Sequence, residues 1–179
     1  DVRDGTHDSP KYVEIGHPLV TSKNLGPNGL HFNKVKFINE NDFTAISKRS
    51  EVNTGDVLFA MIGTIGNPVV VEVTPDFAIK NVALFKMING RSGYFLRYFL
   101  SSKRTMTKMM SEAKGTTQQF VGLGYLRGFP IKVPPLEIED AFVAQVRDID
   151  EKARAIRAHY TTKLQDISDL RQSLLQKAF

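Results

Sequence analysis

The pattern of apolar residues along the chain changes at Pro134-Pro135. Before this pair, short runs rich in Val, Ile and Phe alternate with turns that contain Gly and Pro, which is typical of strands. We expect strands at 18–21, 34–38, 57–62, 69–74, 82–88 and 129–133. A short helix should follow Asn39, because its side chain can cap a first turn in which Asp42 is the third residue.

A longer helix is predicted from Gly93 to Ala113. Five of its residues would share a face towards the core: Phe95, Phe99, Met106, Met110 and Ala113. Four others, at steps of four and three, would share a second face: Arg97, Ser101, Arg104 and Lys108. This second face is either a solvated surface or a stripe that contacts phosphates.

Residues 136–179 contain neither Gly nor Pro and have a strong helical propensity. Their large apolar residues recur mostly at steps of three and four, which predicts one apolar stripe along a single helix: Ile138, Phe142, Val146, Ile149, Ile156, Tyr160, Leu164, Ile167, Leu170, Leu174 and Phe179. Such a helix would be roughly 60 Å long, about twice the width of a small domain. A partner helix is therefore expected. The alternative, a hairpin of two helices, has no turn residue to support it.

These patterns predict an α+β protein with two parts. Residues 1–135 would form a mixed α/β globular domain, and residues 136–179 a long C-terminal helix in an antiparallel coiled coil. We expect the coiled coil to be interrupted, because the heptad-like spacing slips by one residue between Tyr160 and Leu164. Its contact residues would be Phe142, Val146, Ile149, Ile156, Tyr160, Leu164, Ile167 and Leu174.

Composition narrows the function classes. A hydrophobic fraction of 41% can form a core, and no apolar run approaches the roughly 18 residues that a membrane span requires. The sequence has no Cys, which removes disulfides, thiol catalysis and Cys-ligated metals and fits a cytoplasmic protein. Residues 1–135 hold 17 Lys and Arg against 11 Asp and Glu, a net of +6, whereas 136–179 have a net of −1. The globular part therefore favours a polyanionic partner such as DNA.

The stretch "GDVLFAMIGTIGNPVVVEV" could be a glycine loop that binds the phosphates of a nucleotide, because Gly63 and Gly66 lie among apolar residues. A phosphate-binding glycine loop requires a helix directly after it. Here Asn67-Pro68 is followed by a Val-rich run that predicts a strand, and no Gly-Lys-Ser/Thr ending is present. The stretch is therefore predicted to be a strand–turn–strand corner that presents Thr64 and Asn67 on its tip.

Other enzyme signatures are incomplete. Asn67-Pro68-Val69-Val70 lacks the second Pro and the aromatic residue of the adenine-methyltransferase box. Ala78 stands where a metal-dependent nuclease requires an acid, and the four His residues are scattered. We therefore predict no catalytic residue, no metal site and no cofactor in this chain.

In order and spacing, the pieces resemble one family over essentially the whole chain. "RDGTHDSPKY" (3–12), "PLVTSKNL" (18–25), "GDVLFAMIGTIGNPVVV" (55–71) and "GTTQQFVGLGYLRGFPIKVPPLE" (115–137) are similar to segments of the DNA-specificity subunit of type I restriction–modification systems. The chain resembles half of such a subunit, with one target-recognition domain and one spacer helix. The family's usual Glu-Gln after the first Glu of this entry segment is replaced by Ile138-Glu139.

The resemblance implies a non-catalytic subunit that reads double-stranded DNA and guides DNA methylation at a bipartite target. Its partners would be a methyltransferase subunit and a restriction/translocase subunit, which would hold S-adenosylmethionine, ATP and Mg. The chain would be a fragment, or a half-subunit that pairs through its helix with a second copy. Two alternatives stay open: a recognition domain of a fused type II restriction–methylation enzyme, and a coiled-coil adaptor that does not bind DNA.

Base edges are read by polar residues on short loops, and phosphates by Lys and Arg. Many of the polar residues could instead form local turn hydrogen bonds. The candidate DNA-binding residues are His7, Ser9, Lys11, Thr21, Ser22, Lys23, Asn24, Thr64, Asn67, Lys80, Asn81, Arg97, Lys103, Arg104, Lys108, Lys114, Thr116, Thr117, Gln118, Gln119 and Arg127. Further candidates are Asp8 for bases and Lys34, Lys36, Lys48 and Arg49 for phosphates.

Overall fold

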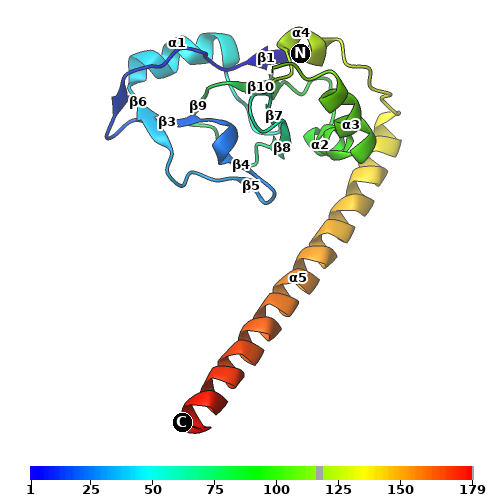
Figure 1. Ribbon diagram of the computed structural model, residues 1–179. Coiled ribbons are helices and arrows are strands. Elements are labelled where there is room, and N and C mark those ends of the chain that lie inside the picture. Colours follow the sequence, from blue (N-terminus) through cyan, green and yellow to red (C-terminus); the bar gives the residue numbers. More distant parts are fainter. Residues whose placement is uncertain (116–118, 179) are drawn as a thin grey trace. The chain divides into compact units, whose positions relative to one another are not determined.

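The computed structural model describes residues 1–115 and 119–178 and divides into two compact units, Asp1–Pro134 and Pro135–Phe179 (Figure 1). The first contains two four-stranded sheets with helices around them, and the second is one long helix. The fold is therefore α+β.

The central sheet has the strand order β1-β10-β7-β8 and is antiparallel throughout. Its strands are β1 (Val2–Asp4), β10 (Val82–Phe85), β7 (Val57–Ala60) and β8 (Gly66–Val70). All residues of β7 and β10 are buried, because both faces of these strands are covered. This explains why their sequences are continuous apolar runs rather than alternating ones.

The two faces of the central sheet contact different cores. Leu58 and Leu84 point into a core with residues of the second sheet, such as Val20 and Ile79. Their neighbours in the sequence, Phe59 and Phe85, point the opposite way. They pack in a second core with residues of the helices that follow the sheet, namely Leu100, Met109 and Leu126. Successive strand residues therefore serve separate layers of the domain.

The second sheet has the order β2-β6-β3-β9, with strands β2 (Tyr12–Val13), β6 (Lys36–Ile38), β3 (His17–Val20) and β9 (Ala78–Ile79). Only the β3–β9 pair is parallel. A 3-10 turn η1 (Ser22–Asn24) leads from β3 into a small hairpin of β4 (Leu25–Gly26) and β5 (Gly29–Leu30). Gly29 adopts φ +114°, a conformation that other residues resist.

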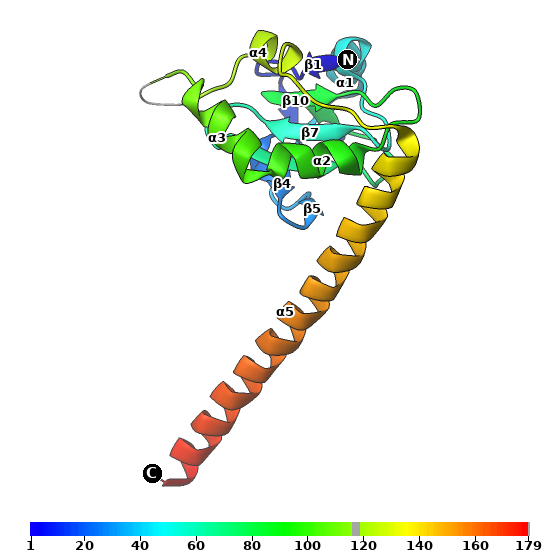
Figure 2. The ribbon, with the colours of Figure 1, turned by 90° about the vertical axis from the view of Figure 1, so that its right-hand side faces the viewer.

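Helix α1 (Glu40–Ser50) begins where the sequence predicts. The Asn39 side chain accepts a hydrogen bond from the Asp42 backbone N–H at 2.9 Å, which satisfies one of the unpaired amides of the first turn. The remaining helices of the first unit are α2 (Gly93–Ser101), α3 (Lys103–Ser111) and α4 (Leu123–Arg127), seen from the side in Figure 2.

The prediction of one helix from Gly93 to Ala113 is wrong in its continuity. Ser102 is extended, with φ −64° and ψ 139°, and its side chain accepts from the Thr105 N–H, so it ends α2 and caps α3. A serine that can cap the next turn competes with a continuous helix. The break changes the phase of the second half. Met109 is buried there, whereas Met110, predicted to face the core, is exposed.

The predicted strands are found at five of the six positions, with shifted ends. The strand predicted at 69–74 is shifted furthest, because β8 already begins at Gly66, and the strand predicted at 82–88 ends early at Phe85. The strand at 129–133 is absent; these described residues are not in a sheet. Pro130 and the Pro134-Pro135 pair lack the N–H groups that a ladder needs.

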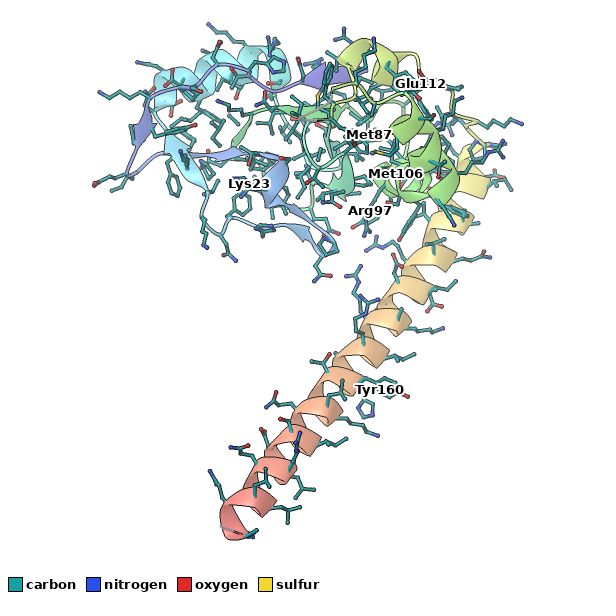
Figure 3. All side chains as sticks on the ribbon, viewed as in Figure 1. Lys23, Met87, Arg97, Met106, Glu112 and Tyr160 are labelled. Carbon is teal, nitrogen blue, oxygen red and sulfur yellow. The ribbon has the colours of Figure 1, made fainter. Side chains whose placement is uncertain are left out.

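Helix α5 (Leu136–Ala178) is continuous over 43 residues, so the hairpin alternative is wrong. It starts directly after Pro135, whose carbonyl accepts from the N–H groups of Ile138 and Glu139. Along it the predicted apolar stripe is between 59% and 68% exposed at Ile149, Ile156, Tyr160, Leu164, Ile167, Leu170 and Leu174 (Figure 3, with Tyr160 labelled). Phe142 is also exposed, and Val146 is half-buried. No helix in the described part of the chain is long and apolar enough to cross a bilayer.

Candidate nucleic-acid interface

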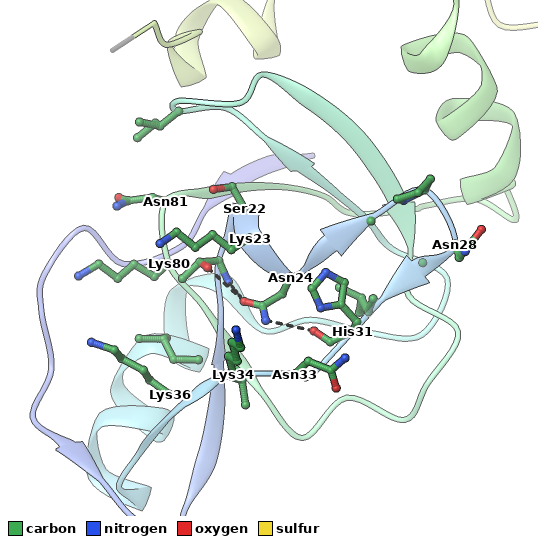
Figure 4. A pocket seen from close by; sticks show the side chains of 18 of the residues that line it. Ser22, Lys23, Asn24, Asn28, His31, Asn33, Lys34, Lys36, Lys80 and Asn81 are labelled. Carbon is green, nitrogen blue, oxygen red and sulfur yellow. Dashed lines mark hydrogen bonds between the residues drawn. The ribbon is translucent and has the colours of Figure 1, made fainter. Parts of the chain in front are cut away.

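An open groove of about 790 Å³ lies on the globular unit (Figure 4). Its walls are η1, the β4–β5 hairpin, the segment 31–36 and the turn at Lys80-Asn81. Four lysines line it: Lys23, Lys34, Lys36 and Lys80. Of the described residues, no Asp or Glu is part of the lining. The groove therefore has a concentrated positive charge that is suited to a polyanion.

The floor of the groove is held by Asn24, which is 4% exposed. Its side-chain oxygen accepts from the Thr21 N–H at 3.0 Å and from the Thr21 hydroxyl at 3.1 Å. Its amide nitrogen donates to the His31 carbonyl at 3.1 Å (dashed in Figure 4). Asn24 therefore ties η1 to the segment after the hairpin. Its amide is engaged inside the protein rather than directed at a ligand.

The lysines of the groove keep their charges available. Lys23 and Lys34 are exposed, Lys36 lies over the Tyr12 ring at 4.1 Å, and Lys80 donates to the Ser9 hydroxyl at 2.8 Å. In the described part of the chain, no carboxylate forms a salt bridge with any of them. Each can therefore neutralise a phosphate without first breaking an internal salt bridge.

Other cations of the globular unit are engaged internally. The Lys86 ammonium lies 2.6 Å from a carboxylate oxygen of the buried Asp56. The Arg49 guanidinium donates to the Gly5 carbonyl at 2.7 Å and lies 3.5 Å from Asp4. Arg127 donates to the Val2 carbonyl at 2.9 Å. Such partners reduce what these side chains can contribute to DNA binding. Two of them, Arg49 and Arg127, were predicted to contact phosphates.

The predicted glycine corner is confirmed: β7 and β8 flank it, and Ala60 pairs with Gly66. Thr64 is exposed at its tip, as predicted. Asn67, also predicted on the tip, lies instead in β8 with φ +47°, and its side-chain amide donates to the Leu25 carbonyl at 3.3 Å. The corner is thereby joined to the hairpin of the groove, and the neighbouring Ile62 lines the groove itself.

The predicted Gln-containing loop adjoins the same corner. The Gln119 carbonyl accepts from the Gly63 N–H at 2.8 Å, and Phe120 bridges to Ile62 and Lys114. Thr116, Thr117 and Gln118 lie outside the described residues.

The predicted basic helical face is divided between α2 and α3. Arg97 lies 5.5 Å from the Tyr98 ring on α2, and Lys108 lies 5.4 Å from the Phe129 ring (Arg97 is labelled in Figure 3). Lys103, Arg104 and Lys114 are exposed. Among the groove-lining residues that the structure describes, none comes from this face. The predicted phosphate contacts therefore do not all belong to one groove.

The His7 cluster is built differently from the prediction. The two ring nitrogens of His7 lie 2.7 Å from the Asn81 side-chain oxygen and 2.8 Å from a carboxylate oxygen of Asp4. The hydrogen bonds to Asn81 and then to Asp4 raise the pKa of His7 above its ordinary value. His7 thus engages the protein with both nitrogens, and Asn81, not His7, lines the groove.

The structure brings six predicted residues and two further phosphate candidates into one groove: Thr21, Ser22, Lys23, Asn24, Lys80 and Asn81 with Lys34 and Lys36. Ser9 joins them through Lys80, whereas the exposed Lys11 is not in the lining. Reasoning from sequence missed Asn28, His31 and Asn33. The "GPNG" turn and the polar "HFNK" that follows it were the available signal.

In fold and site, the globular unit is an α+β domain with a basic groove that suits a polyanion. The family model described as "Type I restriction modification DNA specificity domain" matches residues 9–165. The chain belongs to this family, as its motifs predict.

Two relatives extend the comparison. The chain is 26% identical over 137 residues to the type I restriction enzyme EcoBI specificity subunit of Escherichia coli, and the match covers 74% of this chain and 28% of that protein. A solved structure described as "Structural basis underlying complex assembly and conformational transition of the type I R-M system" has a TM-score of 0.73 at 20% identity. It is matched over 100% of this chain and 43% of that one, which shows the shared fold. The chain thus spans less than half of either relative.

Proposed function

We propose that this chain recognises a DNA sequence for a type I restriction–modification complex in the cytoplasm and directs partner methyltransferase and restriction subunits to it. The observation that carries the proposal is the groove, which is lined by four lysines and, among the described residues, by no Asp or Glu. The chain that carries it belongs to the DNA-specificity family. The chain itself supplies binding, not catalysis.

The groove offers both kinds of contact that sequence recognition requires. Lys23, Lys34, Lys36 and Lys80 would neutralise phosphates and set the register of the protein on the duplex. The amides of Asn28, Asn33 and Asn81 line the same groove, and an asparagine amide can pair with base edges in the major groove. A polyanion and a pattern of base edges would therefore be read by one surface.

The exposed stripe of α5 supports pairing with a second helix. Eight large apolar residues of the stripe, from Ile138 to Leu174, are more than half exposed and would lose water on contact with a partner, each contributing roughly 1 kcal/mol or more. An antiparallel second copy, or a second half-subunit, would bury this stripe and supply a second recognition domain. Two such domains would read the two halves of a bipartite target.

The cofactors of the reaction would reside on the partners. S-adenosylmethionine would be held by the methyltransferase subunit, and ATP and Mg by the restriction/translocase subunit. In the described part of this chain, no group of three or more His, Asp or Glu side chains is arranged to hold a metal ion. We assign binding of none of these cofactors to this chain.

Mapping of methylated adenines in a host with and without the gene tests the proposal. We expect one bipartite motif to be methylated only when the gene is present. The variant Lys23→Gln/Lys34→Gln/Lys36→Gln/Lys80→Gln should abolish this methylation. The control Lys132→Gln/Lys152→Gln/Lys163→Gln/Lys177→Gln removes the same charge outside the groove and should preserve it. Identical methylation maps with and without the gene would contradict the proposal.

A further inference from the structure

The loop that contains His7 is bonded to the groove turn at several points. Thr6 donates its N–H to the Ile79 carbonyl at 2.9 Å, and its own carbonyl accepts from the Asn81 N–H at 3.1 Å. Ser9 accepts from the Lys80 ammonium at 2.8 Å. The segment Thr6–Ser9 therefore supports two residues that line the groove, Lys80 and Asn81.

His7 is the polar centre of this support. Both of its ring nitrogens face side-chain oxygens, Nδ1 that of Asn81 and Nε2 that of Asp4. A neutral imidazole can donate from one nitrogen only, whereas an imidazolium donates from both. Two facing acceptors therefore match the protonated ring. The charged groups around it are Asp4 on β1, which favours the imidazolium, and Arg49 on α1, which opposes it.

Asn81 is held in an unusual conformation by the same contacts. Its φ of +55° lies in the left-handed region, which asparagine tolerates better than most residues. Its side-chain oxygen is engaged by His7, which leaves the amide NH2 group as the part available to a ligand in the groove. Figure 4 labels Asn81 with Lys23 and Lys80 among the lining side chains.

We propose that His7, as an imidazolium held by Asp4, is a positioning residue that orients the Asn81 amide so that its NH2 group faces DNA in the basic groove. The inference rests on the proposed function. DNA presents mainly acceptors to such a groove, namely phosphate oxygens and the N7, O6 and O4 atoms of the major-groove edges. An NH2 group directed into the groove therefore adds a donor where donors are needed.

Loss of the proton on Nδ1 reverses this orientation. The Asn81 oxygen would then face a lone pair, and the amide would turn over so that its NH2 group donates to Nδ1 instead. Asn81 would present an acceptor to the acceptors of DNA. Because the pKa of His7 is raised, this change should occur as the pH rises above the ordinary histidine range. Loss of one hydrogen bond of this kind corresponds to about a fivefold weaker affinity.

The test is a pH profile of DNA affinity between about pH 6 and pH 9, measured by anisotropy with the full chain. The probe is a fluorescein-labelled duplex selected by the wild-type chain from a random-sequence library. His31 also lines the groove, so all measurements use a His31→Gln background. In this background we expect affinity to fall about fivefold with rising pH. His7→Asn keeps a pH-independent donor near Nδ1, and Asn81→Ala removes the oriented amide, so both should give flat profiles.

The possible outcomes separate the two proposals. Selection of no duplex at any pH would overturn the proposed function. Binding with the same pH profile in the background, in His7→Asn and in Asn81→Ala would overturn the positioning role while leaving DNA recognition intact. His17→Asn removes another imidazole that contacts two side-chain oxygens, outside the groove lining, and should leave the profile unchanged.

Discussion

Asp56→Asn should destabilise the globular unit strongly, because the Gly55-Asp56 motif anchors the central sheet. Asp56 is 2% exposed and immediately precedes β7. One carboxylate oxygen accepts from the Asn53 N–H at 2.7 Å and the Lys86 ammonium at 2.6 Å, and the other accepts from the Met87 N–H at 3.1 Å. Its charge therefore joins the start of β7 to the end of β10.

The expected magnitude follows from these contacts. The introduced amide would keep the shape of the side chain but replace one acceptor by a donor, leaving donors unpaired and the Lys86 charge uncompensated. Removing one partner of a buried ion pair costs about 3 to 5 kcal/mol. Because Lys86 is 12% exposed in its side chain and also donates to the Glu51 carbonyl at 3.1 Å, we expect the lower end, about 3 kcal/mol.

Urea unfolding followed by tyrosine fluorescence measures this change, with Asp1→Asn as the matched control. Asp1 contacts Arg3 at 2.7 Å, close to the Asp56–Lys86 distance, but the Arg3 and Asp1 side chains are 38% and 45% exposed. An exposed pair contributes about 0 to 1 kcal/mol. The double variant Asp56→Asn/Lys86→Met removes both charges and should be more stable than Asp56→Asn alone. If Asp56→Asn costs no more than Asp1→Asn, the reasoning is wrong.

Three further predictions follow from other elements. The His17 ring lies 2.7 Å from both Glu40 and Asp76, and the bond to Glu40 is the main cause of its raised pKa. Its stabilising effect is therefore complete below the ordinary histidine pKa and is lost as the pH rises through the raised value. Urea midpoints should thus fall less over this window in His17→Gln than in wild type, and the fall that remains comes from His7, whose pKa is also raised. Asn24→Ala removes three hydrogen bonds of the groove floor, so it should destabilise the domain by about 2 kcal/mol and weaken DNA binding. Unchanged DNA affinity in a binding titration would speak against a preformed groove. Ile156→Asp places a charge in the exposed stripe of α5 and should convert a paired species to a monomer, as measured by light scattering. Arg157→Asp, on another side of the helix, should leave the mass unchanged. An unchanged mass for Ile156→Asp would reject the pairing.

Much of the fold could be predicted because its signals are local. The 3–4 spacing after Pro135 predicts α5, and the Asn39 cap predicts the start of α1. The break at Ser102 could not be predicted in the same way, because it depends on which residues the rest of the domain accepts into its core. The two-residue strands β2 and β9 are equally hidden, since they exist only through their pairing with distant segments.

For the site, the sequence predicts the residue types better than their roles. Lys23, Lys80 and Asn81 do line one groove, although 57 residues separate the first two in the sequence. Asn24 and His7 look equally suited to bases in the sequence, yet their polar atoms are engaged within the protein. Only three-dimensional contacts distinguish a side chain that touches a ligand from one that supports it.

The central claim, that the lysine groove binds DNA, is tested most directly by the salt dependence of affinity. Each neutralised phosphate contributes about −0.9 to the slope of log K against log salt, so the four lysines should contribute about −3.6. Between ~50 and ~200 mM salt this share corresponds to a loss of roughly 100-fold in affinity. We predict that Lys23→Gln/Lys34→Gln/Lys36→Gln/Lys80→Gln has a slope shallower by about this amount. A slope equal to that of the wild-type chain would contradict the account.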